Sequence, residues 1–504
     1  MTQTSTEPQA GRSTDLLKSS IKFFHIVLMV TAAAAPLVVV STYIPISVAY
    51  GAGIAVPITY AATTLVLVIF TIGFAQMAKR ITSAGAFYTF TAQGLGRPFG
   101  LSVGLMILAA YSMIAAAIAG GLGYFSATLF RDYFGVDIAW YWYAIGMMAV
   151  MFLLSYYRVT VTARILGFLL TLEVLVVIIL CVSIIVQGGA DGQMPESLNP
   201  ASWSSAPALG IGFFFAFWSW IGFETTAIYG EETHDPKKSV PRATFIAVLV
   251  LGTFYTFASY AGIVGFGNQS VEKATELLGT YYFVLADLYS VPIVRTAMDI
   301  FVVTGFFACV FAWQNNASRY FYSLGRDRIL PPALGVTHPK YKSPYVASAA
   351  QTVTAIVTVA LFAMAGADPL LELSTWLAIF STLSVIAVQC LVSIAVIMYF
   401  NRIGRNGPGD YWKTMIAPII GTIAQLVIMG LLLQNLTFLA GSEATVVQLI
   451  PLFVAIVAVV GFVYALWLRR SSPERYERIG MLHDEEMMEA FVDEKAILDD
   501  QRAP

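Results

Sequence analysis

Long apolar stretches recur along this chain and are separated by short polar connections. An apolar stretch of roughly 18 or more residues with few charges is long enough to cross a bilayer as a helix. The pattern therefore predicts an all-α integral membrane protein with about twelve transmembrane helices. We expect these helices at residues 23–49, 54–78, 99–129, 138–156, 162–186, 206–230, 241–267, 293–323, 345–365, 372–400, 414–438 and 446–468.

The order of these helices indicates a duplicated unit. Five predicted helices lie in residues 23–186 and five more in residues 206–400. A repeat with an odd number of helices must insert the second time with opposite topology, which is the inverted-repeat arrangement of secondary transporters. The long connections at 83–100 and 270–290 correspond under this inversion. Two additional helices follow at 414–468.

Polar segments flank the predicted membrane region at both ends of the chain. Residues 1–22 form a tail whose first part is rich in Ser, Thr, Pro and Gly, and residues 471–504 form an acidic tail. The segment MLHDEEMMEAF in the second tail is interpreted either as a short amphipathic helix or as part of a solvated tail. Both tails are predicted to be cytoplasmic.

Composition and charge agree with a multi-pass membrane protein. Hydrophobic residues make up 58% of the chain and charged residues only 12%. With the N-terminus inside, only Arg131, Lys273 and Arg295 of the 28 Lys and Arg residues fall outside. Cytoplasmic loops carry an excess of Lys and Arg, so this distribution predicts the cell membrane with both termini in the cytoplasm.

The sequence offers no set of residues for catalysis or metal binding. Cys181, Cys309 and Cys390 lie within predicted helices, where they act as small buried apolar residues. The four histidines are scattered, and no Cys/His spacing fits a metal site. There is no nucleophile with an adjacent base, no phosphate-binding loop and no basic patch with interleaved aromatics. We therefore expect no enzyme, no cofactor, no metal and no nucleic-acid partner.

Two predicted helices carry interruptions at comparable depth. Pro36 lies inside helix 23–49, where it removes a backbone donor. Gly222 lies inside helix 206–230, close to Glu224. A carboxylate at membrane depth costs about 2.5–3.5 kcal/mol and normally faces a cavity or a partner. Interrupted helices at matching places in two halves indicate a binding site near the midplane, and two ordinary kinks are the alternative.

Four segments resemble the amino acid–polyamine–organocation permeases over nearly the whole chain. They are GEETHDPKKSVPRAT after the sixth helix, NNASRYFYSLGRDRILPPALGVTHPKYKSP at the end of the eighth, SAGAFYTFTAQGLGRPFG after the second, and FWSWIGFE within the sixth. The resemblance implies a five-plus-five inverted-repeat fold, similar to the leucine transporter, with two additional helices. It also implies transport of amino acids or related amines.

The same resemblance implies a substrate site where the first and sixth helices open. The family usually has a Gly-Ser-Gly type sequence in the first helix, and here the corresponding residues are alanines followed by Pro36. Trp218 matches an aromatic gate and Trp313 a second pocket aromatic. Ile114 and Ala117 give the third helix an apolar surface, which favours a neutral amino acid. The implied substrate-binding residues are Ala33, Ala34, Ala35, Ile114, Trp218, Ser219, Ile221, Gly222 and Trp313.

Glu173 is the candidate for ion coupling. It lies in the middle of the fifth helix, with no Lys or Arg within two turns. Burial favours the neutral form of a carboxyl group, so Glu173 is predicted to carry a proton. The resemblance places the coupling group between helices 1, 5 and 8. A sodium site would need hydroxyl ligands, and helix 8 has no Ser or Thr between Thr304 and Ser318. A purely structural Glu173 is the alternative.

Further charged residues are candidates for gates. Glu224 is predicted to link the opened sixth helix to a neighbour and, with Trp218, to act in gating. Glu231 and Arg319 are predicted to belong to an inner gate, and a solvated loop is the alternative. The other members of this cytoplasmic group are Glu232, Asp235, Lys237, Lys238, Arg242 and Arg326. Arg295 and Asp299 have the spacing of an ordinary helical ion pair.

The sequence therefore predicts a proton-coupled importer of a neutral amino acid that works by alternating access. The alternatives within transport are a polyamine or amino-alcohol permease and an amino acid exchanger, because Pro36 lacks an N–H that could hold a carboxylate. An amine sensor without transport and a channel are alternatives of another class. The sequence leaves the substrate, the coupling ion and the choice between monomer and homodimer open.

Overall fold

The computed structural model describes residues 16, 21–157, 159–405, 407–439 and 444–481. The side chains of residues 157–166 are not described. The described residues contain helices and one isolated bridge between Ile21 and Thr233, and no β-strand. Most of the first tail and the part of the acidic tail beyond residue 481, including the remainder of MLHDEEMMEAF, lie outside the described residues.

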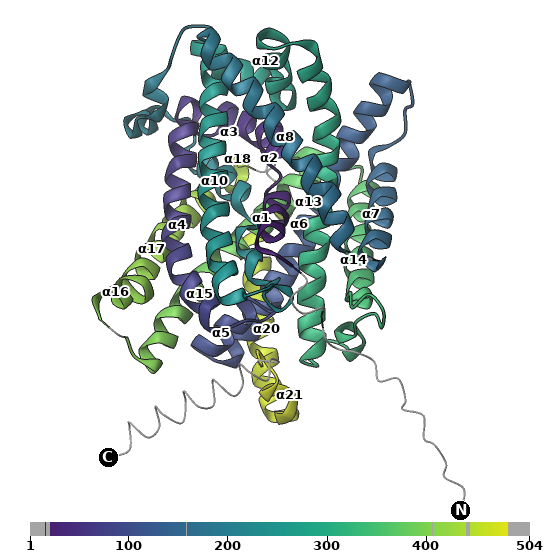
Figure 1. Ribbon diagram of the computed structural model, residues 1–504, viewed down its shortest axis with the longest axis vertical. Coiled ribbons are helices and arrows are strands. Elements are labelled where there is room, and N and C mark those ends of the chain that lie inside the picture. The colour runs from purple at the N-terminus through teal and green to yellow at the C-terminus, as the bar shows by residue number, and fades with distance from the viewer. Residues whose placement is uncertain (1–15, 17–20, 158, 406, 440–443, 482–504) are drawn as a thin grey trace, which may run out of the picture.

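The helices form one bundle whose axes run roughly along its long direction (Figure 1). The longer α-helices are α1 (Phe23–Ala34), α4 (Val56–Arg80), α6 (Arg97–Phe134), α7 (Trp140–Tyr157), α8 (Val159–Gln187), α9 (Leu209–Trp220), α10 (Pro236–Phe266), α13 (Pro292–Arg326), α14 (Tyr345–Met364), α15 (Thr375–Ile403), α17 (Ala417–Gln434) and α20 (Ile450–Ser471).

Shorter elements occupy the two ends of the bundle. At the upper end in Figure 1 lie α3 (Ile44–Tyr50) and α12 (Tyr281–Tyr289), and at the lower end lie α5 (Phe87–Leu95) and α21 (Pro473–Glu477). The helix α11 (Ser270–Leu277) packs against α3. Of these helices, α5 lies in the long connection at 83–100, and α11 and α12 lie in the one at 270–290.

The structure confirms an all-helical membrane protein. Among the described residues, ten helices are long and apolar enough to cross a membrane. The predicted span 138–156 corresponds to a shorter apolar helix, Trp140–Tyr156. The predicted span 206–230 is not one continuous helix, because α9 ends at Trp220 and is followed by short 3₁₀ turns. Gly222 lies at this break with φ 121°, outside the helical region.

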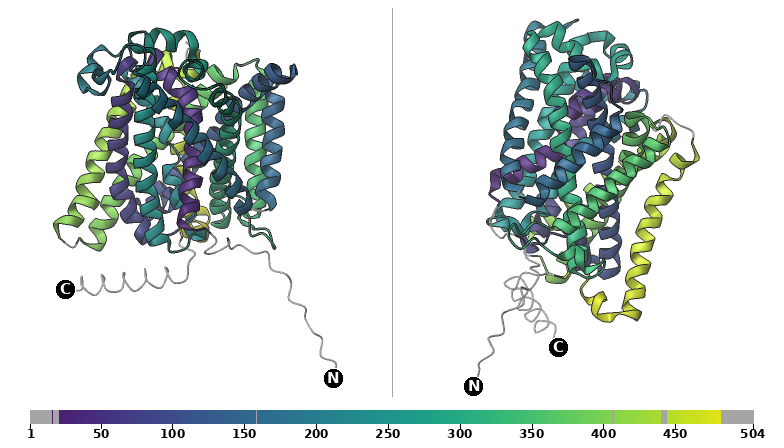
Figure 2. Two further views of the ribbon diagram at one scale, coloured as in Figure 1. Left: turned by 45° about the horizontal axis from the view of Figure 1, so that its top comes forward. Right: turned by 90° about the vertical axis from the view of Figure 1, so that its right-hand side faces the viewer.

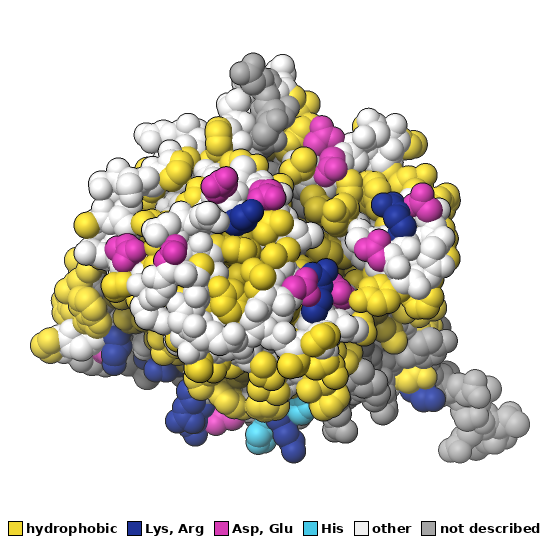
Figure 3. Space-filling model, turned by 90° about the horizontal axis from the view of Figure 1, so that it is seen from above, with side chains coloured by type: hydrophobic (Ala, Val, Ile, Leu, Met, Phe, Trp, Pro, Cys, Tyr) yellow, Lys and Arg dark blue, Asp and Glu magenta, His cyan; other side chains and the backbone are white. Residues whose placement is uncertain are grey.

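The scaffold around the centre is built from long buried helices. The central helix α6 packs against α13, α15 and α20, and α4 packs against α10. The last span, α20, lies along one side of the bundle, yellow in Figure 2. Seen from above, the upper face carries few Lys or Arg side chains, and Asp and Glu side chains are scattered among its apolar and uncharged ones (Figure 3).

Candidate functional site

The first transmembrane segment is interrupted at Ala35. Helix α1 ends at Ala34, and Ala35 has φ 44° and ψ 71°, in the left-handed region. Pro36 then begins the short helix α2 (Pro36–Val38), which continues through a π-helical turn (Val39–Tyr43) into α3. Left-handed backbone costs a non-glycine residue roughly 1–2 kcal/mol, so this break is a strained feature held by its surroundings.

The sixth segment is interrupted two residues after α9 ends. Ile221 has extended backbone angles and Gly222 has φ 121°, which favours glycine. A 3₁₀ turn over Phe223–Ala227 follows. A Cβ on Gly222 would lie 3.0 Å from the Cβ of Ala33 and 3.2 Å from the ring of Trp313. The two interruptions therefore face each other in the centre of the bundle.

A small cavity lies between the two interruptions. The free space inside it is narrow, so a ligand would require the lining side chains to move apart. All of its lining residues are buried, which leaves it occluded on both sides. The lining residues are Ala33, Ala34, Ala35, Val38, Val39, Tyr43, Ile114, Ile118, Trp218, Ser219, Ile221, Cys309 and Trp313.

Eight of the nine residues named from the sequence line this cavity, and Gly222 lies next to it against Ala33 and Trp313. The prediction from the sequence did not include five lining residues, Val38, Val39, Tyr43, Ile118 and Cys309. A signal for two of them exists, because Ile118 follows Ile114 by four residues and Cys309 precedes Trp313 by four. Residues four apart lie on the same face of a helix.

Aromatic rings cover the cavity on two sides. The ring of Tyr43 stacks on Phe215 at 6.0 Å and meets Trp218 edge-on at 6.1 Å. On the other side Trp313 packs edge-on against Tyr111, with ring centres 4.8 Å apart. Such aromatic pairs contribute about 0.5–1.5 kcal/mol beyond the area they bury, so they stabilise the covered arrangement.

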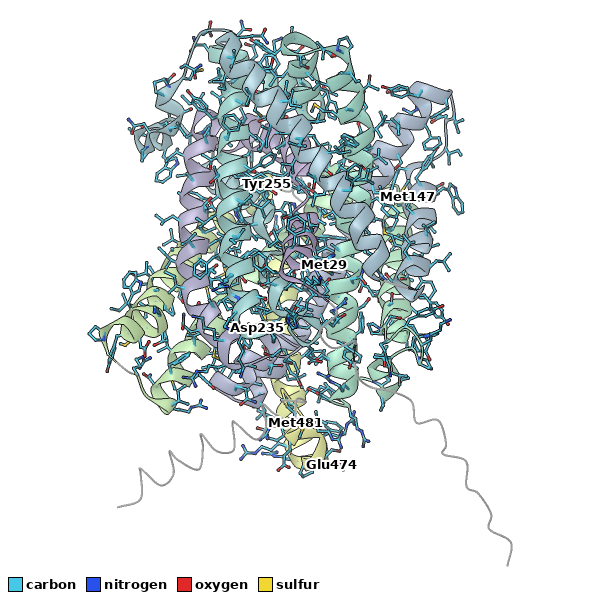
Figure 4. The ribbon with its side chains drawn as sticks, viewed as in Figure 1. Met29, Met147, Asp235, Tyr255, Glu474 and Met481 are labelled. Atoms are coloured by element: carbon cyan, nitrogen blue, oxygen red, sulfur yellow. The ribbon has the colours of Figure 1, made fainter. Side chains whose placement is uncertain are left out.

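Two carbonyl groups of the first break already have partners within the protein. The carbonyl of Ala33 accepts hydrogen bonds from Trp313 Nε1 at 3.1 Å and from Cys309 Sγ at 3.2 Å. The carbonyl of Ala34 accepts from the hydroxyl of Tyr255 at 2.8 Å. Tyr255 comes from α10, in the upper half of the bundle in Figure 4, and nothing in the sequence pattern singled it out.

Glu173 binds the same break from its other side. Its Oε1 accepts a hydrogen bond from the N–H of Leu37 at 3.0 Å, and only 1% of the residue is exposed. A Cβ on Gly305 would lie 2.7 Å from Oε1, so Gly305 lets α13 approach the carboxyl group closely. Glu173 thus lies between the first, fifth and eighth transmembrane segments.

Glu224 supports the sixth-segment break. Its Oε2 accepts a hydrogen bond from the N–H of Gly222 at 3.0 Å, and its Oε1 accepts one from the hydroxyl of Tyr111 at 2.8 Å. Tyr111 lies on α6, so the carboxyl group links the interrupted segment to the central scaffold helix. Glu224 is fully buried and does not line the cavity.

Two ion pairs lie below the cavity, toward the lower end of the bundle. Arg319 pairs with Glu232 at 2.8 Å, and its guanidinium lies 4.3 Å from the ring centre of Tyr229. Arg326 pairs with Glu231, with nitrogen–oxygen distances of 2.8 Å and 2.9 Å. Glu231 and Arg319, both named as gate residues from the sequence, therefore belong to two separate pairs.

The rest of the cytoplasmic charge group lies at the surface. Asp235, Lys237, Lys238 and Arg242 are exposed, and Lys238 pairs with Asp235 at 3.3 Å. Exposed pairs contribute little to stability, so the solvated-loop interpretation describes these four residues. Arg295 pairs with Asp299 at 3.2 Å, which confirms the helical ion pair expected from their spacing.

Among the described residues, no group of three or more His, Cys, Asp or Glu side chains is arranged to hold a metal ion. The cavity instead offers aromatic rings, aliphatic side chains and the backbone of two interrupted helices. No charged side chain is among its lining residues. Such a site can hold a small molecule by shape and by backbone polar groups.

A family model described as "Amino acid permease" matches residues 21–462. The branched-chain amino acid permease BcaP of Bacillus subtilis is 24% identical over 331 residues, which cover 59% of this chain and 65% of that protein. The low-affinity putrescine importer PlaP of Escherichia coli is 22% identical over 302 residues, which cover 57% of this chain and 63% of that protein. These matches span just under two thirds of each relative.

An uncharacterized transporter of Rhizobium meliloti is 26% identical over 340 residues, covering 65% of this chain and 68% of that protein. Among solved structures, MhsT in complex with L-phenylalanine aligns with a TM-score of 0.56 at 14% identity. The alignment covers 83% of this chain and 99% of that structure. The shared fold is that of the leucine-transporter-like proteins, in agreement with the fold class expected from the sequence.

Proposed function

The chain belongs to the amino acid permease family, and from this premise we propose that it imports a neutral amino acid across the cytoplasmic membrane by alternating access. The observation that carries the proposal is the occluded cavity between the two interrupted helices, lined by aliphatic and aromatic residues without a charged side chain. A charged substrate side chain would lose its hydration there without gaining a partner. A branched or otherwise apolar side chain matches the chemistry of this lining.

The backbone ends of the interrupted helices supply the polar contacts. Helix α9 ends at Trp220, so the carbonyl groups of its last turn lack the N–H donors that a further α-helical turn would supply. They form the negative end of a helix dipole and suit the ammonium group of the substrate. The start of α2 is the positive end of a helix, and its dipole favours a carboxylate, although Pro36 has no N–H and the N–H of Leu37 already binds Glu173. An amino acid can satisfy both ends at once.

Proton coupling through Glu173 is part of this proposal. The N–H of Leu37 lies in the first turn after the break, and the Glu173 carboxyl group accepts its hydrogen bond. A charged carboxylate stabilises this positive helix end more than a neutral carboxyl group does. Protonation of Glu173 therefore changes the stability of the segment that begins beside the substrate. That link is the physical basis for coupling.

Gating would use the covers on either side of the cavity. Tyr43, Phe215 and Trp218 would move to open the upper side, which we assign to the outside. The pairs Arg319–Glu232 and Arg326–Glu231 would break to open the lower, cytoplasmic side. This orientation is supported by the excess of Lys and Arg in the loops at the lower end of the bundle, since cytoplasmic loops carry such an excess. Both termini would then lie in the cytoplasm.

A second candidate substrate is an amine without a carboxylate. One relative is named a putrescine importer. In this chain Pro36 has no N–H at the start of α2, and the N–H of Leu37 already binds Glu173. Two of the donors that could hold a substrate carboxylate are therefore missing or occupied. A polyamine or amino alcohol does not need them.

Thermal stabilisation of the purified protein separates these candidates. A ligand at 100 times its Kd stabilises a protein by about 2.7 kcal/mol, which raises the unfolding midpoint. We expect leucine, isoleucine, valine and phenylalanine to raise it, and arginine, glutamate and putrescine to leave it unchanged. Stabilisation by putrescine or ethanolamine, without an effect of any amino acid, would favour the second candidate and reject the first.

A further inference from the structure

The chain after the last transmembrane helix turns back and docks against the lower end of the bundle. Ile479, just beyond α21, is buried with 2% of its surface exposed. The guanidinium of Arg97, at the start of α6, lies 5.5 Å from the ring centre of Tyr476. We call residues 473–481 the C-terminal strap; its residues Glu474 and Met481 are labelled at the bottom of Figure 4.

Gly480 forms the centre of the contact between the strap and the bundle. Its N–H donates to the hydroxyl oxygen of Tyr88 at 2.6 Å, and that hydroxyl donates to Asp327 Oδ2 at 2.6 Å. Gln93 Nε2 donates to the carbonyl of Gly480 at 3.0 Å. Burial, reinforced by the Asp327 carboxylate, raises the pKa of Tyr88 well above its usual value, so the hydroxyl stays protonated.

The strap touches the same two elements that hold Glu231. The Glu231 carboxylate accepts a hydrogen bond from the N–H of Ala84, just before α5, at 2.8 Å. It also pairs with Arg326, the last residue of α13. The strap binds α5 through Tyr88 and Gln93, and it binds the end of α13 through Asp327, the neighbour of Arg326.

From these contacts we propose that the C-terminal strap, acting through Tyr88 and Asp327, positions α5 and the end of α13 so that they hold Glu231. The strap thereby keeps the cytoplasmic side of the cavity closed. When it undocks, Ala84 and Arg326 lose their fixed spacing, and the contact of Glu231 with one of these two residues is lost. The inference rests on the proposed function only in treating the pair of Glu231 and Arg326 as a gate.

Gly480→Ala provides a way to undock the strap in the full chain. A Cβ at Gly480 would lie 2.3 Å from the Cβ of Ala92, and Gly480 has φ 66°. Gly404→Ala is the matched control, because Gly404 has φ 87° but nothing lies within 4 Å of its Cβ position. Both variants place an alanine at a positive φ, and only Gly480→Ala introduces a clash with α5.

The measurement is the rate at which Cys309, which lines the cavity, reacts with a membrane-impermeant maleimide. It uses inside-out vesicles and a chain carrying Cys181→Ala and Cys390→Ala, so that Cys309 is the remaining cysteine. We expect Gly480→Ala to raise the rate about five- to tenfold, the effect of losing one or two hydrogen bonds. Gly404→Ala keeps the original rate.

Two further variants complete the test. Tyr88→Phe removes the central hydroxyl without a clash and is expected to raise the rate in the same direction. Glu231→Gln removes the charge of the gate itself and sets the rate for a weakened gate. The inference is overturned if Gly480→Ala and Tyr88→Phe react at the control rate while Glu231→Gln reacts faster, or if no variant reacts faster.

The readout needs no transported substrate. If Gly480→Ala reacts faster but the protein takes up no amino acid, the proposed function is rejected and the role inferred for the strap is supported. If amino acid uptake is normal but Gly480→Ala reacts at the original rate, the role inferred for the strap is rejected and the proposed function is retained.

Discussion

At the scale of single residues, the first break is held by side chains from three other helices. Glu173 binds the N–H of Leu37, Tyr255 binds the carbonyl of Ala34, and Trp313 binds the carbonyl of Ala33. Unpaired polar groups are costly in the membrane interior, so each contact compensates for a hydrogen bond that the helix gave up. The same contacts fix the shape of the cavity wall.

Tyr255→Phe tests one of these contacts. The ring keeps its packing against Tyr60 and Trp220, while the carbonyl of Ala34 loses its donor. We expect KM for the transported amino acid to rise about five- to tenfold, equivalent to about 1–1.4 kcal/mol, because the cavity wall is no longer fixed. Uptake kinetics in proteoliposomes measure this change.

Tyr282→Phe is the control for this variant. Its hydroxyl is also buried and donates to a carbonyl of α10, that of Ala258, at 2.9 Å. Ala258 lies in an unbroken helix away from the cavity, so KM should stay unchanged. Equal effects of the two variants on KM would show that Tyr255 contributes only general stability.

At the scale of the elements, the first segment is the unusual one. Ala35 adopts a left-handed conformation that is ordinarily favoured by glycine. The alanine restricts the backbone here and adds a methyl group to the cavity wall. The break is therefore specified by Pro36 and by the surrounding contacts, rather than by a flexible residue.

Ala35→Gly is expected to stabilise the protein by about 0.5–1 kcal/mol. Relief of the left-handed strain is worth roughly 1–2 kcal/mol, and the added freedom of glycine in the unfolded chain costs roughly 0.5–1 kcal/mol. Ala34→Gly, inside the last turn of α1, should destabilise by a similar amount. Thermal unfolding of the two variants gives the comparison, and a shift in the same direction for both would contradict the left-handed assignment.

The sequence predicted most of the fold and much of the cavity. The apolar spans, the interruptions at Pro36 and Gly222 and eight cavity residues follow from periodicity and from family resemblance. Tyr255 and the contacts of Gly480 could not be predicted, because a buried tyrosine or a tail glycine gives no local pattern. Their partners are more than 150 residues away in the chain, and only packing brings them together.

At the scale of the whole molecule, the cavity is closed on both sides at once. Aromatic rings cover it above, and two ion pairs and the strap hold the elements below. A buried pair is expensive to break by removing one partner, so opening must move both partners together with their helices. Alternating access therefore requires coordinated movement of the interrupted segments against α6 and α13.

The proposed function requires that an amino acid passes through this cavity together with a proton carried by Glu173. Uptake of radiolabelled leucine into proteoliposomes with an alkaline interior measures this coupling. We expect accumulation above the external concentration that a protonophore abolishes. Glu173→Gln cannot release a proton, so it should lose accumulation while still exchanging leucine across the membrane. Accumulation by Glu173→Gln equal to that of the original protein would contradict proton coupling through Glu173.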